Sequence, residues 1–261
     1  MQTVTSADGT RIAYETAGEG PPLVCLHGSP ETRDCWRAVR PQLADAFRLI
    51  MPDRRGHGDS GDADAYTLDR EIEDLCAINE AIDGEVSVFG HSFGGIVALA
   101  AATEMPVDRL VVYEPPMLVG EYNEELTEQL RTLVSNGNRQ EAMKRFYQEA
   151  AGIPDPEQLP IWPDGVRFEL LETIIRERAA TEAVDQTAVC DIDTKTLVVT
   201  GERSPPHLRA AVRTVDEQLS RSQRVELDGV GHVGLQTAPE RLASAVQEFW
   251  HEPESNPEIN G

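Results

Sequence analysis

Short apolar runs and amphipathic segments alternate along the first part of the chain. The runs are four or five residues long and rich in Val, Leu, Ile and Phe, as strands buried on both faces are. The segments between them repeat apolar positions every three or four residues, which is typical of helices with one buried face. This alternation predicts a mostly parallel, doubly wound sheet, so the fold class is α/β. The expected strands are 23–26, 47–51, 86–89 and 110–113, and the expected helices are 33–43, 68–82 and 92–103.

The first residues carry a different signal. Residues 4–6 and 11–16 are strand-like, and Asp8-Gly9 between them is a strong turn dipeptide. We therefore expect a hairpin ahead of the parallel strands.

The middle of the chain departs from the alternation. Residues 121–134, 139–150 and 166–180 are amphipathic with no strand between them, and four prolines punctuate the stretch. We interpret it as a helical cap inserted into the sheet domain. Alternation then resumes with strands at 196–200 and 223–227 and helices at 205–219 and 239–250. The predicted α/β core is residues 1–117 and 189–251, the cap is 118–188, and the polar tail 252–261 is expected to be disordered.

Composition limits the class of protein. The chain has 261 residues, of which 40% are apolar, enough for one sizeable core. The first ten residues lack the basic start and apolar run of a signal peptide, and no stretch approaches the roughly 18 apolar residues of a membrane span. We expect a soluble, cytoplasmic protein.

The charge is strongly negative. Asp and Glu number 46 against 23 Lys and Arg, and only Lys144 and Lys195 are lysines, giving a net charge of −23. Phosphates would be repelled, so neither nucleic acid nor a membrane is an expected partner. So many negative charges repel one another and destabilise the folded chain, and concentrated salt screens this repulsion. An acidic, lysine-poor composition of this kind resembles that of proteins from salt-accumulating halophiles. We expect activity and melting temperature to rise with KCl.

Four cysteines have no spacing that suggests a metal site. No pair has CxxC spacing, and none lies beside a histidine at ligand spacing. We expect buried free thiols and no metal. The cysteines are Cys25, Cys35, Cys76 and Cys190.

The strongest chemical signal is residues 90–94, with sequence GHSFG, which matches the G-x-S-x-G nucleophile elbow. An apolar strand precedes it and an alanine-rich helix follows. The glycines allow a sharp strand-to-helix turn, which projects the hydroxyl of Ser92 from the sheet edge. The helix amino end supplies free N–H groups where negative charge develops. Ser92 is therefore the predicted nucleophile.

A serine needs a base to attack a carbonyl, and the chain has six histidines. His232 follows the last expected strand, in a loop that reaches the same sheet edge as Ser92. His91 is the backbone neighbour of Ser92 and cannot easily turn toward it. His27 and His57 follow earlier strands and are expected to brace loops, while His207 opens a helix and His251 lies near the chain end. His232 is the predicted base.

Together these motifs resemble the α/β-hydrolase fold family, in the subset with an HGxP loop, a DxRGHGxS loop and an inserted cap. Here the loops are residues 27–30 and 53–60. The resemblance covers nearly the whole core and is weak in the cap. In most members the acid of the triad is an Asp shortly after the strand that follows the cap. This chain has Ser204 at that position, which departs from the pattern.

Two glutamates remain candidates for the acid. Some members of the family carry it after the strand before the cap, where this chain has Glu114. A right-handed crossover would place that strand beside the elbow strand, with both carboxyl ends at one edge. Glu114 is the predicted acid, because from that position it could reach the base, and the order Ser92, Glu114, His232 keeps the order of the family. Glu202 is the alternative.

Acyl transfer also needs two N–H donors for an oxyanion. One expected donor is the backbone of Phe93, the residue after the nucleophile. By resemblance to the family's HGx loop, the other is the backbone of Ser29, because Pro30 has no N–H.

The resulting hypothesis is a serine hydrolase that cleaves a small carboxylic ester, lactone or related acyl substrate through an acyl-enzyme, with no cofactor. A cofactor-free haloperoxidase or perhydrolase, or a C–C bond hydrolase, could use the same triad. Epoxide hydrolases and haloalkane dehalogenases of the family have Asp where this chain has Ser92. The alternative from another class is a ligand-binding protein on a hydrolase scaffold.

The substrate pocket and the oligomeric state are not determined by the sequence. Cap side chains could line an apolar acyl pocket, but packing of the cap itself is the expected use of any one of them. Trp36 could border the pocket or pack a helix. The cap candidates are Met117, Leu118, Phe146, Trp162 and Phe168.

Overall fold

A computed structural model describes residues 1–116, 124–182 and 186–251, and within them the chain forms one eight-stranded sheet. The strand order is β1-β2-β4-β3-β5-β6-β7-β8. The first two strands pair antiparallel, as the expected hairpin, and β3 to β8 pair parallel. The strands are β1 (Gln2–Thr5), β2 (Arg11–Ala17), β3 (Pro22–Leu26), β4 (Arg48–Pro52), β5 (Ser87–His91), β6 (Arg109–Tyr113), β7 (Lys195–Gly201) and β8 (Ser222–Leu227).

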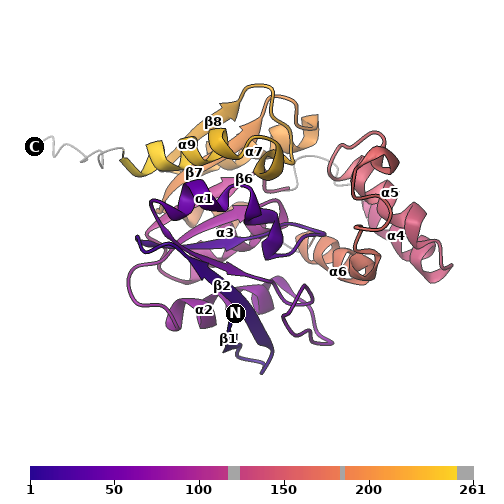
Figure 1. Cartoon of the computed structure of the whole chain (residues 1–261), viewed down its shortest axis with the longest axis horizontal. Coiled ribbons are helices and arrows are strands. Elements are labelled where there is room, and N and C mark those ends of the chain that lie inside the picture. The colour runs from indigo at the N-terminus through magenta and orange to yellow at the C-terminus, as the bar shows by residue number, and fades with distance from the viewer. Residues whose placement is uncertain (117–123, 183–185, 252–261) are drawn as a thin grey trace, which may run out of the picture.

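Helices cover both faces of this sheet, which confirms the predicted fold class (Figure 1). The layers follow from alternation along the strands: Val88 of β5 points to one face and Phe89 to the other. The Val88 face packs against α2 (Leu68–Glu80), α3 (Phe93–Glu104) and α7 (Pro206–Gln218). The Phe89 face packs against α1 (Arg40–Ala44), α8 (Gly234–Thr237) and α9 (Pro239–His251).

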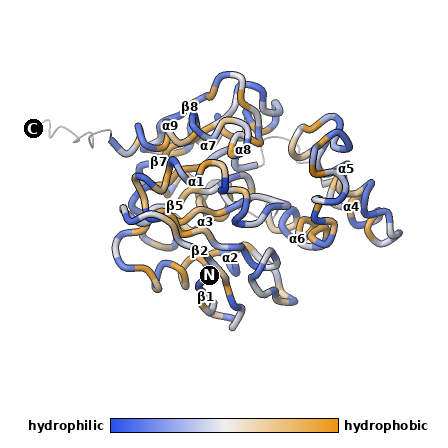
Figure 2. Tube along the Cα trace, viewed as in Figure 1, coloured by the Kyte–Doolittle hydropathy of each residue, from blue (hydrophilic) through white to orange (hydrophobic). Residues whose placement is uncertain are grey.

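Burial follows the hydropathy of the sequence. Hydrophobic positions gather in the central strands and α3, and hydrophilic positions cover the outer helices (Figure 2). Trp36 lies in the core, with its ring 4.9 Å from that of Phe89, so it packs the sheet rather than bordering the site. In the part of the chain that the structure describes, no helix is long and apolar enough to cross a membrane.

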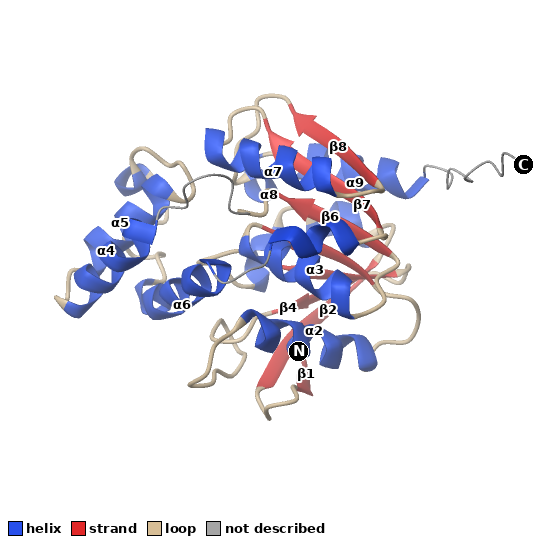
Figure 3. Cartoon of the chain, turned by 180° about the vertical axis from the view of Figure 1, so that it is seen from behind, coloured by secondary structure: helices blue, strands red, loops and turns tan. Residues whose placement is uncertain are grey.

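Between β6 and β7 the chain leaves the sheet and forms helices of its own, which lie beside the carboxyl ends of the strands (Figure 3). They share a small apolar core that contains Phe146, with Trp162 and Phe168 packed against it. The exact cap limits, residues 118–188, stay a prediction, and Met117, Leu118 and the tail lie outside the described residues. The segments are α4 (Glu124–Ser135), α5 (Arg139–Glu149), α6 (Leu171–Glu182) and the short 3-10 turns Pro156–Gln158 and Phe168–Leu170.

Two sequence predictions need correction. The single helix expected over residues 33–43 is a 3-10 turn, Arg33–Arg37, followed by α1. Pro41 lies in the first turn of α1, where its missing N–H costs nothing, so it favours a new helix start rather than a helix interior. Cys190 is exposed and Cys76 is half-buried, so only Cys25 and Cys35 are the buried thiols expected. The short helix α8 and the 3-10 turn Gln186–Asp191 were not predicted.

Candidate active site

Ser92 lies at the junction of β5 and α3. Its backbone has φ 52° and ψ −124°, a conformation that L residues rarely adopt, and its N–H donates to the Tyr113 carbonyl at 2.9 Å. A Cβ on Gly90 would overlap the Gly94 carbonyl, and a Cβ on Gly94 would overlap the Leu26 carbonyl. The two glycines are therefore what lets strand, turn and helix approach closely enough to hold Ser92 in this turn.

The HGSP loop packs against the nucleophile elbow. A Cβ placed on Gly28 would lie 2.8 Å from Cβ of Ser92, so only glycine fits there. Among the residues that the structure describes, the backbone N–H groups of Ser29 and Phe93 have no hydrogen-bond partner. Phe93 is the first residue of α3, whose initial N–H groups have no carbonyl within the helix. Two free donors thus flank the serine.

The ring of His232 contacts a buried carboxylate. Its Nδ1 lies 2.7 Å from Oε2 of Glu114, whose side chain is fully buried. Oε1 of Glu114 accepts hydrogen bonds from the Thr200 hydroxyl at 2.7 Å and from the Gly201 N–H at 2.8 Å. With both carboxylate oxygens occupied, Nδ1 carries the proton and Nε2 of His232 is left as an acceptor.

Glu114 is held by an unusual backbone. It follows β6 with φ 50°, one of two described non-glycine residues with positive φ, the other being Ser92. Its N–H donates to the Val199 carbonyl of β7 at 3.1 Å, which directs the residue toward the edge where the strands end. Such strain persists where the surrounding structure fixes it, often at functional sites.

The other acid candidate lies elsewhere. Glu202 is exposed and accepts a hydrogen bond from the Gly229 N–H at 2.7 Å, so it ties down a turn rather than a histidine. Ser204, at the position where most of the family has Asp, is buried, and its hydroxyl is one of the groups that lower the pKa of Glu114. The carboxylate that contacts His232 therefore comes from the residue that follows β6, not from the loop after β7.

The electrostatics suit a carboxylate and a neutral imidazole. Burial would raise the pKa of Glu114, but the hydrogen bonds and charge of His232 outweigh it and lower that pKa, so the carboxyl stays ionised. Burial lowers the pKa of His232 below its ordinary 6.5, assisted by His91 and opposed by Glu114 and Glu31. At neutral pH His232 is therefore available to accept a proton.

His91 connects three segments around the elbow. Its Nε2 lies 3.0 Å from the His232 carbonyl, its Nδ1 lies 3.2 Å from Oε2 of Glu31, and its ring centroid is 4.9 Å from that of His232. Oε1 of Glu31 also accepts from the Gln236 amide at 3.0 Å. The histidine next to the nucleophile thus joins the HGSP loop to the loop that carries His232.

The remaining histidines have supporting contacts. His27 accepts from the Arg54 N–H at 3.0 Å through Nε2, and its Nδ1 faces the Gly28 carbonyl at 2.8 Å. His57 lies between the Glu31 carbonyl and the carboxylate of Glu177, at 2.9 Å from each. Both rings therefore brace loops. His207 and His251 are exposed.

Sequence reasoning missed two carboxylates. Glu31 follows the HGSP motif directly, but nothing in its spacing indicates that it meets His91. Glu177 offered a signal: it shares one face of α6 with Ile174 and Thr181, and all three are buried. A carboxylate on an apolar helical stripe indicates a partner on the neighbouring element. Among the described residues no group of three or more His, Cys, Asp or Glu could hold a metal ion.

This sheet, with a serine at a strand-to-helix turn and a histidine–carboxylate pair at the same edge, defines the chain as an α/β hydrolase. A model of the alpha/beta hydrolase family matches residues 23–245, so the chain belongs to that family and is an enzyme.

Known proteins resemble the chain over different lengths. A soluble epoxide hydrolase of Corynebacterium sp. (strain C12) is 39% identical over 41% of this chain and 39% of its own, so the chain spans well under half of that relative. A pimeloyl-[acyl-carrier protein] methyl ester esterase of Nitrosomonas europaea is 28% identical over 89% of this chain and 97% of its own. The crystal structure of an alpha/beta hydrolase from Sphaerobacter thermophilus is 34% identical, covers 95% of this chain and 100% of that one, and has a TM-score of 0.84.

Proposed function

We propose that this enzyme is a serine hydrolase that cleaves a small carboxylic ester, lactone or related acyl substrate, with Ser92, His232 and Glu114 as its triad. The observation that carries the proposal is the 2.7 Å contact between Nδ1 of His232 and Glu114, at the sheet edge where Ser92 turns into α3. The contact leaves Nε2 free to accept a proton, which is what a serine nucleophile requires.

The reaction would run in two halves. His232 takes the hydroxyl proton of Ser92 as the oxygen attacks the acyl carbon, and the oxyanion is held by the backbone N–H groups of Ser29 and Phe93. The imidazolium returns its proton to the leaving alcohol, which departs and leaves an acyl-enzyme. Water then repeats the attack with the same base, releasing the acid and restoring Ser92.

Two features favour an acyl substrate over other chemistry of the fold. Epoxide hydrolases of the family place Asp at the nucleophile, whereas this chain has Ser92, so the similarity to the epoxide hydrolase extends to the fold rather than the reaction. One relative that matches along nearly its whole length is named as a methyl ester esterase. Ester cleavage is therefore the reaction proposed.

The test is turnover of p-nitrophenyl acetate by the full chain, assayed in high KCl, beside Ser92→Ala. We expect steady hydrolysis by the parent, an acetylated Ser92 peptide after rapid acid quench, and neither in the variant. Turnover that survives in Ser92→Ala would contradict the assignment of the nucleophile. A parent that binds esters without turning them over would favour the ligand-binding alternative.

A further inference from the structure

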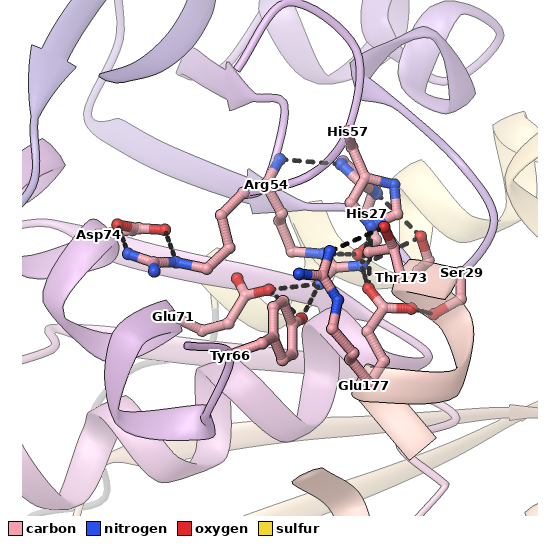
Figure 4. Close-up of polar contacts among 12 residues, drawn as sticks. His27, Ser29, Arg54, His57, Tyr66, Glu71, Asp74, Thr173 and Glu177 are labelled. Atoms are coloured by element: carbon pink, nitrogen blue, oxygen red, sulfur yellow. Dashed lines mark hydrogen bonds and ion pairs between the residues drawn. The ribbon is translucent and has the colours of Figure 1, made fainter. Parts of the chain in front are cut away.

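Glu177 is a cap residue whose carboxylate is buried in the core. It belongs to α6, and its side chain is 1% exposed. Figure 4 shows it pointing away from the cap, toward the HGSP loop and the side chain of Arg54. Packing alone would favour an apolar residue here, because burying a carboxylate costs free energy unless its partners satisfy it.

The partners of the Glu177 carboxylate come from the HGSP loop (residues 27–30) and from the loop of residues 53–60. One carboxylate oxygen accepts a hydrogen bond from the hydroxyl of Ser29. The other accepts from Nη2 of Arg54 and lies 2.9 Å from Nε2 of His57. Burial opposes ionisation of Glu177, but the charges of Arg54 and His57 and the hydrogen bonds with His57 and Ser29 together outweigh it and lower the pKa to about 2. Glu177 is thus a carboxylate at any pH at which the enzyme would work.

Arg54, which pairs with Glu177, also holds the HGSP loop. Nε of Arg54 donates to the His27 carbonyl at 2.8 Å, and the Arg54 N–H donates to Nε2 of His27 at 3.0 Å. Nη1 of Arg54 is 2.8 Å from Oε1 of Glu71, so the guanidinium lies between two carboxylates, one from the core and one from the cap (Figure 4). Nδ1 of His57 lies 2.9 Å from the carbonyl oxygen of Glu31, the residue that follows the HGSP loop. Glu177 completes this arrangement from the cap side.

We propose that Glu177 is a positioning residue through which the cap sets the oxyanion hole: its carboxylate holds Ser29 by the side chain and so fixes the backbone N–H of that residue. The inference rests on the proposed function, in which that N–H binds the oxyanion. Because Glu177 belongs to α6, the packing of α6 against the core and the geometry of the oxyanion hole would depend on the same contact. Displacing a catalytic group by about 1 Å can cost about 100-fold in rate.

The kinetic test uses Glu177→Gln, Ser29→Ala and the double variant. Ser29→Ala removes only the hydroxyl and keeps the N–H, so it isolates the link. We expect each single variant to lower kcat about 10- to 100-fold with little change in KM, because an oxyanion donor acts in the transition state. The double variant should lose no more than about threefold beyond either single one, since both break the same link.

The matched control is Glu172→Gln. Glu172 lies on the same helix, is 55% exposed and pairs with Arg139 at 2.6 Å on the surface, so its kcat should equal that of the parent. Phenylboronic acid, whose serine adduct mimics the tetrahedral state, should lose affinity with Glu177→Gln and not with Glu172→Gln. Melting temperatures of all variants show whether each is folded at the assay temperature.

A second measurement does not depend on turnover. In a ¹H–¹⁵N spectrum, the Ser29 amide should shift in Glu177→Gln and stay in place in Glu172→Gln. An unmoved Ser29 amide, an unchanged kcat in Ser29→Ala, or losses that multiply in the double variant would each overturn the role of Glu177. If the parent itself showed no Ser92-dependent turnover, the proposed function would fail, while the spectrum would still decide whether Glu177 holds Ser29.

Discussion

Replacing Glu114 with glutamine tests the acid of the triad with almost no change of shape. Oε1 of Glu114 accepts from two donors, the Thr200 hydroxyl and the Gly201 N–H. In the amide, the carbonyl oxygen must stay with these donors, which turns the NH₂ group toward Nδ1 of His232. That nitrogen must then act as an acceptor, and its proton moves to Nε2. The imidazole would present an N–H to Ser92 and could not take the hydroxyl proton.

The expected loss follows from this change of tautomer. In the Ser-His-Asp template, the same acid-to-amide change lowers kcat about 10⁴-fold. At about 1.4 kcal/mol for each factor of ten, that is about 5 kcal/mol of lost transition-state stabilisation. Stopped-flow or steady-state hydrolysis of p-nitrophenyl acetate in high KCl measures it, and circular dichroism verifies that the variant is folded.

Glu202→Gln is the matched control, because Glu202 is exposed and bonded to the Gly229 N–H. Its kcat should remain within about twofold of the parent, as surface changes away from the site usually have small effects. A Glu114→Gln variant that keeps its kcat, beside a Glu202→Gln variant that loses it, would refute the reasoning and exchange the two roles.

Three further predictions follow from the same geometry and charge. Adding Ser204→Asp to Glu114→Gln should raise kcat at least about tenfold, since Ser204 is buried beside Glu114 and a carboxylate there could contact Nδ1 of His232. No recovery of kcat would mean that a carboxylate at position 204 cannot reach the His232 ring. Because burial lowers the pKa of His232, the acid limb of the kcat/KM profile should have its midpoint below pH 6.5, and a parent midpoint at pH 7 or above would be inconsistent with this. His91→Gln should raise that midpoint, because it removes a group that lowers the pKa of His232 and leaves the Glu31 carboxylate, which raises it, in place. The net charge of −23 predicts a melting temperature that rises between about 0.1 and about 2 M KCl, whereas greatest stability in dilute buffer would argue against a halophilic surface.

The sequence by itself determined the features that depend on short stretches of chain. The order of strands and helices follows from alternating apolar periods, and the observed strands contain or overlap every one expected. The place of Ser92 in a strand-to-helix turn follows from Gly90 and Gly94, because no other residue fits the backbone contacts there. The order of the strands along the chain also favours His232 as the base, since a loop after the last parallel strand lies at the same sheet edge as Ser92.

Only the tertiary structure decided which side chains meet across that edge. Glu114 and Glu202 both follow strands that end near one another, and both are acidic, so local pattern cannot separate them. The separation comes from the positive φ of Glu114 and from the donors Thr200 and Gly201 on the next strand. Likewise, the partner of Glu177 is 123 residues away at Arg54. Hydrogen bonds act over about 3 Å, and that separation is set by how the elements pack rather than by their order along the chain.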